Sequence, residues 1–282
     1  MVLTKRDREI VKAVYTHRFL TTFQIENLIF LKGQPPKRTQ CRRRLQLLYH
    51  HGFLDRVFPL VTRDEGAKPI IHCLAEGGAE LIAAELQIGR DEVDWRPKDN
   101  KVKPLFLDHG LSINEVRIAT TLAAERQGFE LEKWIDEKTL KNPKMRDYVT
   151  ISTPRGRSRR VPVIPDGYFV LNLGGKRAHF FLEVDQATLS NTRWRERAHA
   201  YLSYTSQGLY QKRYQTRSLR ILTITTGEKR LENLKATTEA AGGERMFWFT
   251  TFDQATPDVL TAPVWHVASK QGLHTLIELP MI

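Results

Sequence analysis

A glycine pair between two apolar runs constrains the fold of this chain most strongly. The runs "IPDGYFVLNL" and "KRAHFFLEVD" flank Gly174-Gly175. Both glycines can adopt positive φ, and this favours a two-residue turn between antiparallel strands. Counting outward from such a turn places Asp166 opposite Glu183, because the turn fixes the register. The sequence therefore predicts a β-hairpin over residues 164–185.

Three acidic side chains lie within this predicted hairpin. Asp166 and Glu183 face each other, and Asp185 lies two residues further along on the same face. Carboxylates directly opposite each other repel, so the chain must gain something by holding them together. Mg²⁺ and Mn²⁺ prefer oxygen ligands of this kind. The spacing therefore predicts a divalent-metal site with Mg²⁺ or Mn²⁺ bound by Asp166, Glu183 and Asp185.

The second half of the chain alternates between helical and strand patterns around this hairpin. A helix over residues 107–128 is followed by a strand over 129–137 and a long basic loop over 141–160. After the hairpin we expect a helix capped by Ser190, a strand over 218–226, a helix over 228–242 and a last strand over 245–252. This order predicts an α/β (α+β) domain with a mixed sheet.

The charge of the chain points to a polyanionic partner. The chain has 282 residues, 41% of them hydrophobic, and a formal net charge of +12. Residues 1–60 hold 12 Lys and Arg against 4 Asp and Glu, so nucleic acid is the expected partner class. There is no signal-peptide pattern and no apolar run long enough for a membrane span. Cys41 and Cys73 are too few for a disulfide framework or a zinc site, so we expect a cytoplasmic protein without a membrane partner.

The first 80 residues carry the pattern of a winged helix-turn-helix. Two short helices over residues 4–17 and 21–30 precede a loop with Pro35-Pro36 and a third helix ended by Gly52. Alternating residues over 53–78 then predict a β-hairpin. In a winged helix the third helix enters the major groove. We therefore expect a DNA-binding domain over residues 1–80, a connector over 81–106 and a second domain over 107–282.

A basic cluster falls on this third helix. The stretch "KGQPPKRTQCRRR" contains six basic residues and no acidic one. A solvated surface helix could carry the same charge, but the cluster's place in the pattern favours duplex DNA. Base and phosphate contacts are both expected here, with further backbone contacts from the tip of the hairpin. The expected base contacts are Thr39, Gln40 and Arg43, and the remaining contacts are Lys37, Arg38, Arg42, Arg44, Arg63 and Lys68.

The motifs and their order resemble the PD-(D/E)xK nuclease superfamily over about residues 107–226. Pro165-Asp166 matches the family's Pro-Asp, and Glu183-Val184-Asp185 matches its acid-x-lysine element, with Glu115 as a candidate acid on the first core helix. The resemblance implies a restriction-endonuclease-like domain. With the amino-terminal domain, and on the stretches "LDHGLSINEVR" and "FFLEVDQAT", the chain resembles the replication-relaxation family. This implies DNA-associated roles in plasmid or mobile-element replication, transfer or their control.

One position departs from the nuclease pattern. The family's lysine, which orients the attacking water, is replaced by Asp185, although Arg193 or Arg197 on the next helix could supply a cation. Two hypotheses follow: a DNA-binding protein with a catalytically inactive scaffold, or a metal-dependent DNA endonuclease. The tyrosines that follow the basic helix suggest a relaxase nucleophile, but no histidine cluster accompanies them. A homodimer and replication or transfer proteins are partners that the sequence leaves open.

Overall fold

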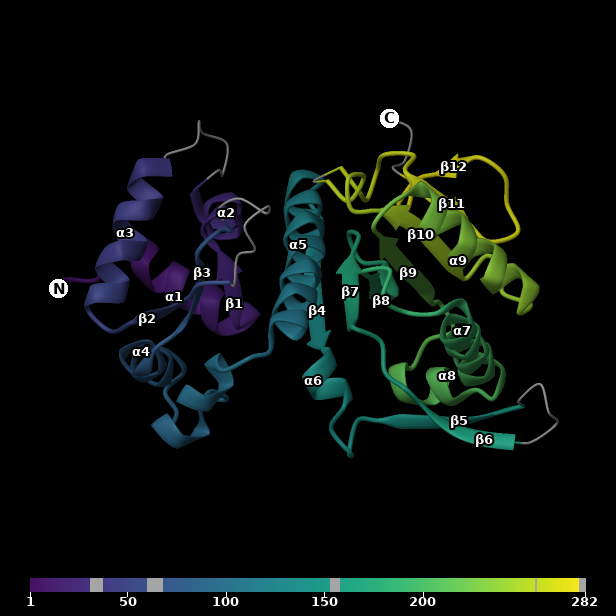
Figure 1. The fold of residues 1–282 in the computed structure, drawn as a ribbon, viewed down its shortest axis with the longest axis horizontal. Helices are drawn as coiled ribbons and strands as arrows, with labels where there is room; N and C mark the ends of the chain where they lie inside the picture. The colour runs from purple at the N-terminus through teal and green to yellow at the C-terminus, as the bar shows by residue number, and fades with distance from the viewer. Residues whose placement is uncertain (31–37, 60–67, 153–157, 257, 279–282) are drawn as a thin grey trace. The chain divides into compact units, whose positions relative to one another are not determined.

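The computed structural model describes residues 1–30, 38–59, 68–152, 158–256 and 258–278 (Figure 1). The chain divides into two compact units, Met1–Ile118 and Ala119–Ile282, and the division falls within helix α5 (Pro104–Arg126). The fold is mixed α/β with a large mixed sheet, as predicted. Among the described helices, none combines the length and the apolar character needed to cross a lipid bilayer.

The first unit contains short helices and a small antiparallel sheet. Helix α1 begins after Thr4, whose side chain and backbone form a reciprocal capping box with Asp7. Thr21 caps the second helix in the same way. The elements are α1 (Lys5–His17), β1 (Phe19–Thr21), α2 (Thr22–Ile25), the π-helix η1 (Glu26–Phe30), α3 (Arg38–His50), β2 (Leu54–Val57), β3 (Ile71–Leu74) and α4 (Glu76–Leu86).

The three strands of this unit pair in the order β1-β3-β2, and both pairs are antiparallel. Val57 lies opposite Ile71, so the hairpin predicted within residues 53–78 is present, with strands Leu54–Val57 and Ile71–Leu74. Its tip, with Arg63, lies outside the described residues. On α3, Cys41, Leu45 and Leu48 are buried; together with the strands, they give the unit its own hydrophobic core.

Residues predicted as a connector are folded onto this unit. Helix α4 packs against α1, and Glu85 forms ion pairs with Arg8 and Lys12. The short 3₁₀ helices η2 (Arg90–Glu92) and η3 (Pro97–Asn100) follow. Trp95 is 7% exposed and its Nε1 donates to Asn100 Oδ1 at 3.0 Å. The segment therefore contributes buried side chains, which its charged composition concealed.

The second unit is built on a mixed sheet whose described strands run in the order β12-β11-β10-β9-β8-β7-β4. The pairs β8/β9 and β9/β10 are parallel and the other pairs are antiparallel. The elements are β4 (Glu130–Asp136), α6 (Glu137–Leu140), β5 (Asp147–Ser152), β6 (Ser158–Val163), β7 (Gly167–Asn172), β8 (Arg177–Asp185), α7 (Asn191–Ser206), α8 (Leu209–Tyr214), β9 (Arg220–Thr225), α9 (Glu228–Ala240), β10 (Phe247–Thr251), β11 (Trp265–Val267) and β12 (Leu273–His274).

The hairpin β7–β8 has the predicted register. Gly167 pairs with Leu182 and Asn172 with Arg177. Gly174 and Gly175 form the turn with φ values of 74° and 98°, a conformation that residues with a Cβ rarely adopt. Asp166 immediately precedes β7 and lies beside Glu183, because the Asp166 amide donates to Leu182 O at 2.9 Å.

The prediction of a loop over residues 141–160 is wrong. Strands β5 and β6 form an antiparallel hairpin in which Asp147 pairs with Val163. Val149 and Ile151 are buried on one face, and Arg160 lies over the Tyr148 ring at 4.1 Å from its centroid. The basic composition of the stretch concealed this alternation. The first strand of the predicted hairpin over residues 164–185 also begins later than predicted, at Gly167, and the preceding strand β6 ends at Val163.

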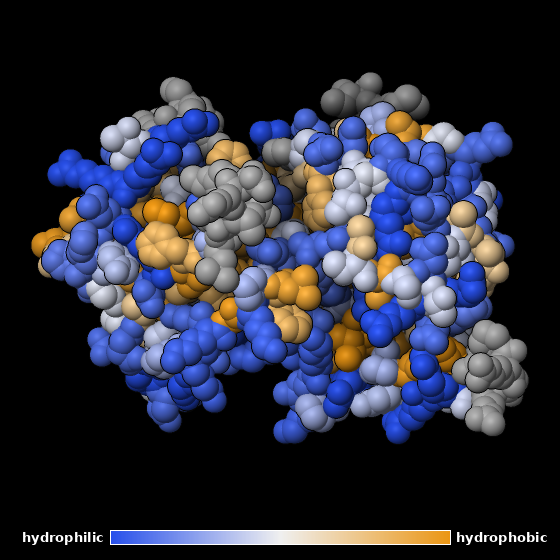
Figure 2. Space-filling view, viewed as in Figure 1, coloured by the Kyte–Doolittle hydropathy of each residue, from blue (hydrophilic) through white to orange (hydrophobic). Residues whose placement is uncertain are grey.

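Helices α7, α8 and α9 contribute to one hydrophobic core with the large sheet. Phe181 of β8 and Phe249 of β10 are buried in it together with Tyr201 and Trp194 of α7. Trp194 Nε1 donates to Thr238 Oγ1 of α9 at 2.8 Å, which ties the two helices together. On the face seen in Figure 2, most of the surface is hydrophilic and hydrophobic groups form separate patches. The sheet face under α7 is where the predicted acids lie.

Candidate functional site

The three predicted acids come together at the ends of β7 and β8 and are all buried. The exposed fractions are 4% for Asp166, 1% for Glu183 and 6% for Asp185. Strand alternation places Glu183 and Asp185 on the same face as Phe181, toward α7 and α9. A buried carboxylate is costly unless it is hydrogen-bonded and paired with a positive charge. The partners of each acid therefore decide what the site can do.

Asp166 is bound to the backbone of the neighbouring strand. Its Oδ2 accepts from the Val184 amide at 2.7 Å, and its own amide donates to Leu182. The carboxylate thus takes the place of a backbone carbonyl at the end of the β7–β8 ladder. It fixes the start of β7 against β8, which is a structural role for this acid.

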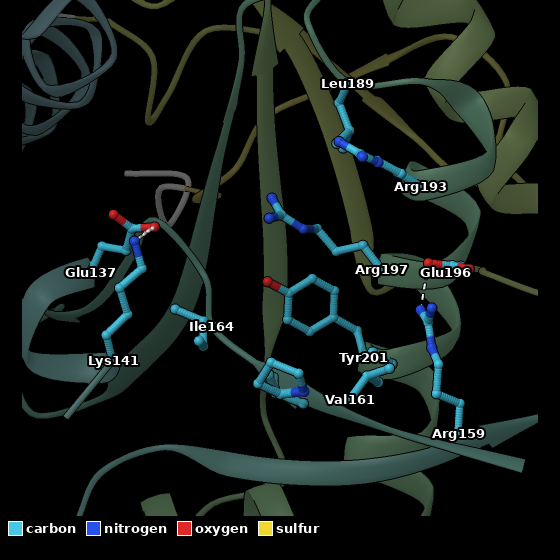
Figure 3. A pocket seen from close by; sticks show the side chains of 13 residues that line it. Glu137, Lys141, Arg159, Val161, Ile164, Leu189, Arg193, Glu196, Arg197 and Tyr201 are labelled. Carbon is cyan, nitrogen blue, oxygen red and sulfur yellow. Dashed lines mark hydrogen bonds and ion pairs between the residues drawn. The ribbon is translucent and has the colours of Figure 1, made fainter. Parts of the chain in front are cut away.

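Glu183 is held by two side chains from α7. Arg197 donates to Glu183 Oε2 and forms an ion pair with it, while the Tyr201 hydroxyl donates to Oε1. Arg197 and Tyr201 are four residues apart, so they share one helix face and extend side by side toward the sheet (Figure 3). Both carboxylate oxygens of Glu183 are therefore occupied by protein donors.

Burial controls the protonation of Glu183. Loss of hydration raises the pKa of the Glu183 carboxyl to about 7, the Arg197 cation opposes this, and the neighbouring Asp166 adds to it. The charged form of a buried acid is disfavoured even when a cation is near. The Glu183 carboxyl therefore keeps a proton to higher pH in the folded protein than in the unfolded chain, although Arg197 and Tyr201 both donate to it.

Asp185 is paired with an arginine from a different helix. Arg230 of α9 donates from Nε to Oδ2 at 2.8 Å and from a terminal nitrogen to Oδ1 at 2.9 Å. Thr225 Oγ1 donates to Oδ2 at 2.7 Å. Burial alone would raise the pKa of Asp185, but the hydrogen bonds from Arg230 and Thr225 outweigh it and lower the pKa. Asp185 is therefore a carboxylate in a bidentate ion pair.

In this arrangement the acids do not fit a divalent cation. Mg²⁺ requires oxygen ligands at about 2.0–2.1 Å in near-octahedral geometry, but the oxygens of Glu183 and Asp185 already accept from arginine and hydroxyl groups. Within the described part of the chain, no three His, Cys, Asp or Glu side chains are grouped to hold a metal. The metal site remains a prediction, and it now requires that Arg197 moves away from Glu183 and Arg230 from Asp185.

Glu115, the fourth predicted acid, lies in the first unit instead. Its Oε2 accepts from Gln24 Nε2 at 3.0 Å, and Gln24 also donates to Leu111 O. The structure adds two residues that the sequence did not identify as partners of the acids, Tyr201 and Arg230. The helical spacing from Arg197 could have indicated Tyr201, whereas Arg230 is far away in sequence and no local pattern connects it to Asp185.

A cavity of about 360 Å³ lies beside this cluster, bounded by α6, β6 and α7 (Figure 3). Arg197 and Tyr201 line it. Two ion pairs lie at its edge, Lys141–Glu137 at 2.7 Å and Arg159–Glu196 at 2.6 Å. Tyr201 donates to Glu183 and is fully buried, and burial raises its pKa. It is therefore a structural donor and not an exposed nucleophile.

In the first unit, helix α3 carries the described part of the predicted DNA contacts. Arg42 and Arg43 are exposed and have no side-chain partner among the described residues. Thr39 and Gln40 are also exposed, and Gln40 accepts from Arg6 at 3.4 Å. Arg38 lies 3.7 Å from Glu26. Lys37 and Arg63 fall outside the described residues, and Lys68 lies just before β3.

Arg44 differs from the other basic residues of α3. It is half-buried and forms a two-point ion pair with Asp7, whose side chain is fully buried. Asp7 also accepts from Thr4 at the start of α1. Burial would raise the pKa of Asp7, but hydrogen bonds from Arg44 and Thr4 outweigh it and lower the pKa. Arg44 therefore joins α3 to α1 and is not available as a free phosphate contact.

Comparisons with known proteins identify the family of this chain. The comparison with curated proteins found no match. Restriction endonuclease FokI is a structural match with a TM-score of 0.31 and 9% identity, covering 90% of this chain and 44% of that one; a likeness at this level does not establish a shared fold or activity. The family model described as replication-relaxation matches residues 11–219. The chain therefore belongs to the replication-relaxation family.

Proposed function

We propose that the protein binds duplex DNA through its first unit and acts in the replication or transfer of a plasmid or other mobile element, or in their control. The observation that carries the proposal is the pair Arg42 and Arg43 on α3, exposed and without partners among the described residues. Arginines in this state can bind phosphate or base edges without first breaking an internal ion pair.

The arrangement of the first unit supports a winged helix. Three helical segments precede the antiparallel pair β2–β3, and β1 completes a sheet in the order β1-β3-β2. In winged helices the helix before the hairpin enters the major groove, and here that helix is α3. Thr39 and Gln40 are exposed near its start, where base contacts are expected. The proposed DNA contacts come from one chain, so they require neither a homodimer nor a replication partner, although either could supply further contacts.

For the second unit we favour a scaffold that does not cleave DNA, because Arg197 and Arg230 occupy the carboxylates that a catalytic metal would need. Metal-dependent cleavage is the second candidate. One observation that favours it is that Asp166 and Glu183 face each other. A second is that Thr223 pairs with Glu183 in the register of β8 and β9, and the buried Oγ1 of Thr223 has no hydrogen-bond partner among the described residues. Incubation of the full chain with supercoiled plasmid and Mg²⁺ or Mn²⁺ separates the two, since only the second produces nicked or linear DNA.

The binding proposal is tested with a charge-matched pair of variants. Arg42→Ala/Arg43→Ala should weaken duplex binding. It should reduce the slope of log affinity against log salt by about 1 if only Arg42 contacts phosphate and by about 2 if both arginines do, because about 0.9 counterion is released per phosphate contact. Lys98→Ala/Lys101→Ala removes the same charge from exposed positions in the same unit and should leave affinity nearly unchanged. If both pairs of substitutions weaken the affinity equally, binding depends only on net charge and the role of α3 is refuted.

A further inference from the structure

A cavity of about 530 Å³ in the first unit lies between α2, η1, α3 and the strands β2 and β3. Glu26 and His72 line it and are buried, with 5% and 2% of their surface exposed. Arg56 also lines it from β2. Two of the polar side chains that line the cavity are therefore buried in a hydrophobic unit, where each of them needs a partner.

Three of these groups have an atom without a hydrogen bond among the described residues: Glu26 Oε1, His72 Nδ1 and Arg56 Nε. The closest cation to Glu26 Oε1 is Arg38, whose Nε is 3.7 Å away and beyond hydrogen-bond distance. The other ring nitrogen of His72 lies 3.0 Å from Thr22 Oγ1. Burial, with a contribution from Arg56, lowers the pKa of His72 to about 4, so its ring is neutral.

The backbone at Glu26 is also unusual. Glu26 is the first residue of the π-helix η1, which directly follows the helix that Thr21 caps. π-Helical turns are rare and occur frequently at functional sites. The turn holds a buried carboxylate at the wall of the cavity, although an uncharged residue would cost less there.

The charges around the cavity restrict the ligand. Arg38, Arg42 and Arg56 disfavour a simple cation, and the buried carboxylate of Glu26 disfavours a simple anion. The ligand must offer an N–H to Glu26, an acceptor to Arg56 and a negative group to the other two arginines. Phe23, 53% exposed at the edge, adds an aromatic face on which a flat ring can stack.

We propose that this cavity binds a single nucleotide, with its base toward Glu26 and Arg56 and its phosphate toward Arg38 and Arg42. Guanine and thymine fit best, because each presents an N–H next to a carbonyl oxygen. Arg38 and Arg42 are four residues apart on α3 and therefore lie on one helix face. The nucleotide is either a free mononucleotide or an unpaired nucleotide of a DNA strand, since both present the same groups.

Titration calorimetry with the full chain distinguishes these sources. One arm uses free GMP, TMP, AMP and CMP, with inorganic phosphate as the ligand that lacks a base. The other arm compares a fully paired duplex with the same duplex carrying one unpaired guanine or thymine. Glu26→Gln keeps the size of the side chain but removes its negative charge and one of its two acceptor oxygens. We expect a loss of about tenfold or more in affinity for the preferred nucleotide, because a hydrogen bond to a charged acceptor is stronger than one to a neutral acceptor and tenfold is about 1.4 kcal/mol.

Two further variants complete the test. Glu80→Gln changes an exposed carboxylate of α4 and should leave affinity unchanged. Phe23→Ala alters an exposed position that folding tolerates, and it should weaken binding about tenfold through lost stacking, so the proposal stays testable if Glu26→Gln is unfolded. Binding in either arm that depends on Glu26 or Phe23 supports the proposal. The proposal is overturned if neither arm shows binding, if inorganic phosphate binds as tightly as the nucleotides, or if neither variant changes the affinity. The free-nucleotide arm tests the cavity whether or not the chain binds duplex DNA.

Discussion

Replacing Glu183 with glutamine should change how the stability of the protein depends on pH. Glutamine has nearly the same size, and its carbonyl can still accept from Tyr201 or Arg197, so the packing is kept. The variant removes the titration of a carboxyl that is 1% exposed. It also removes the charge that pairs with Arg197, so the pH dependence of the stability difference, and not its absolute size, tests the pKa. Because burial raises the pKa of Glu183 from 4.5 to about 7, the folded protein binds a proton here that the unfolded chain has already released at neutral pH.

The sign and size follow from this difference. A carboxyl whose pKa is raised on folding contributes its full stability below the unfolded pKa of 4.5 and loses it as the pH rises through about 7. Each pH unit between the two values costs about 1.4 kcal/mol. From about pH 5 to about pH 8, the wild type should therefore lose about 2 to 3 kcal/mol relative to Glu183→Gln.

Denaturant unfolding of both proteins, followed by circular dichroism at several pH values, measures this difference. Asp147→Asn is the matched control, because Asp147 lies in the same unit and is paired with Arg213 and Tyr204. Burial would raise the pKa of Asp147, but hydrogen bonds from Arg213 and Tyr204 lower it. The stability that the ionised Asp147 contributes is therefore lost only below the usual pKa range of aspartate. The difference in unfolding free energy between the wild type and Asp147→Asn should not change between about pH 5 and about pH 8. If the Glu183→Gln difference is equally flat, Glu183 does not have a raised pKa and the reasoning is refuted.

Arg44→Ala should lower the free energy of unfolding by about 3 to 5 kcal/mol in urea, because it leaves Asp7 buried and unpaired, whereas Arg43→Ala should have almost no effect. Millimolar Mg²⁺ or Mn²⁺ should leave the melting temperature of the wild type unchanged; a rise that disappears in Asp166→Ala would support the predicted metal site instead. Gly175→Ala should cost about 1 to 2 kcal/mol by thermal unfolding, since φ is 98° at this position, and a neutral result would mean that the turn adopts another conformation.

The parts of the fold that were predictable are those where one local signal determines the geometry. Gly174-Gly175 determined the register of β7 and β8 because a two-residue turn leaves no freedom in the pairing. The strand β5 was missed because its alternation, with Val149 and Ile151 buried, lies inside a basic stretch that reads as a loop. Local composition outweighed a weak period-2 pattern there.

The sequence predicted where the three acids lie in the fold, but it did not predict which side chains they contact. The facing of Asp166 and Glu183 followed from the register, and the helix after Ser190 placed Arg197 within reach of the sheet. The partner of Asp185 could not be found in this way, since Arg230 lies on α9, beyond β9. Ion pairs between distant elements depend on how helices pack on a sheet, and hydrophobic periodicity does not specify which polar side chains then meet.

The residue at position 185 supports our proposal that this cluster holds the sheet together and does not hydrolyse DNA. An aspartate there reverses the charge of the lysine in the nuclease pattern, and Arg230 supplies a positive charge again from α9. That guanidinium also donates to Leu189 O at 2.5 Å and to Asn191 Oδ1 at 2.9 Å, so most of its N–H groups are already used. Arginine stays protonated near neutral pH, so this guanidinium cannot act as a base, and few of its N–H groups are left to orient a water molecule. Since Arg197 neutralises Glu183 in a similar way, cleavage would require two ion pairs to open together. Their internal pairing accounts for the burial of these acids without a metal.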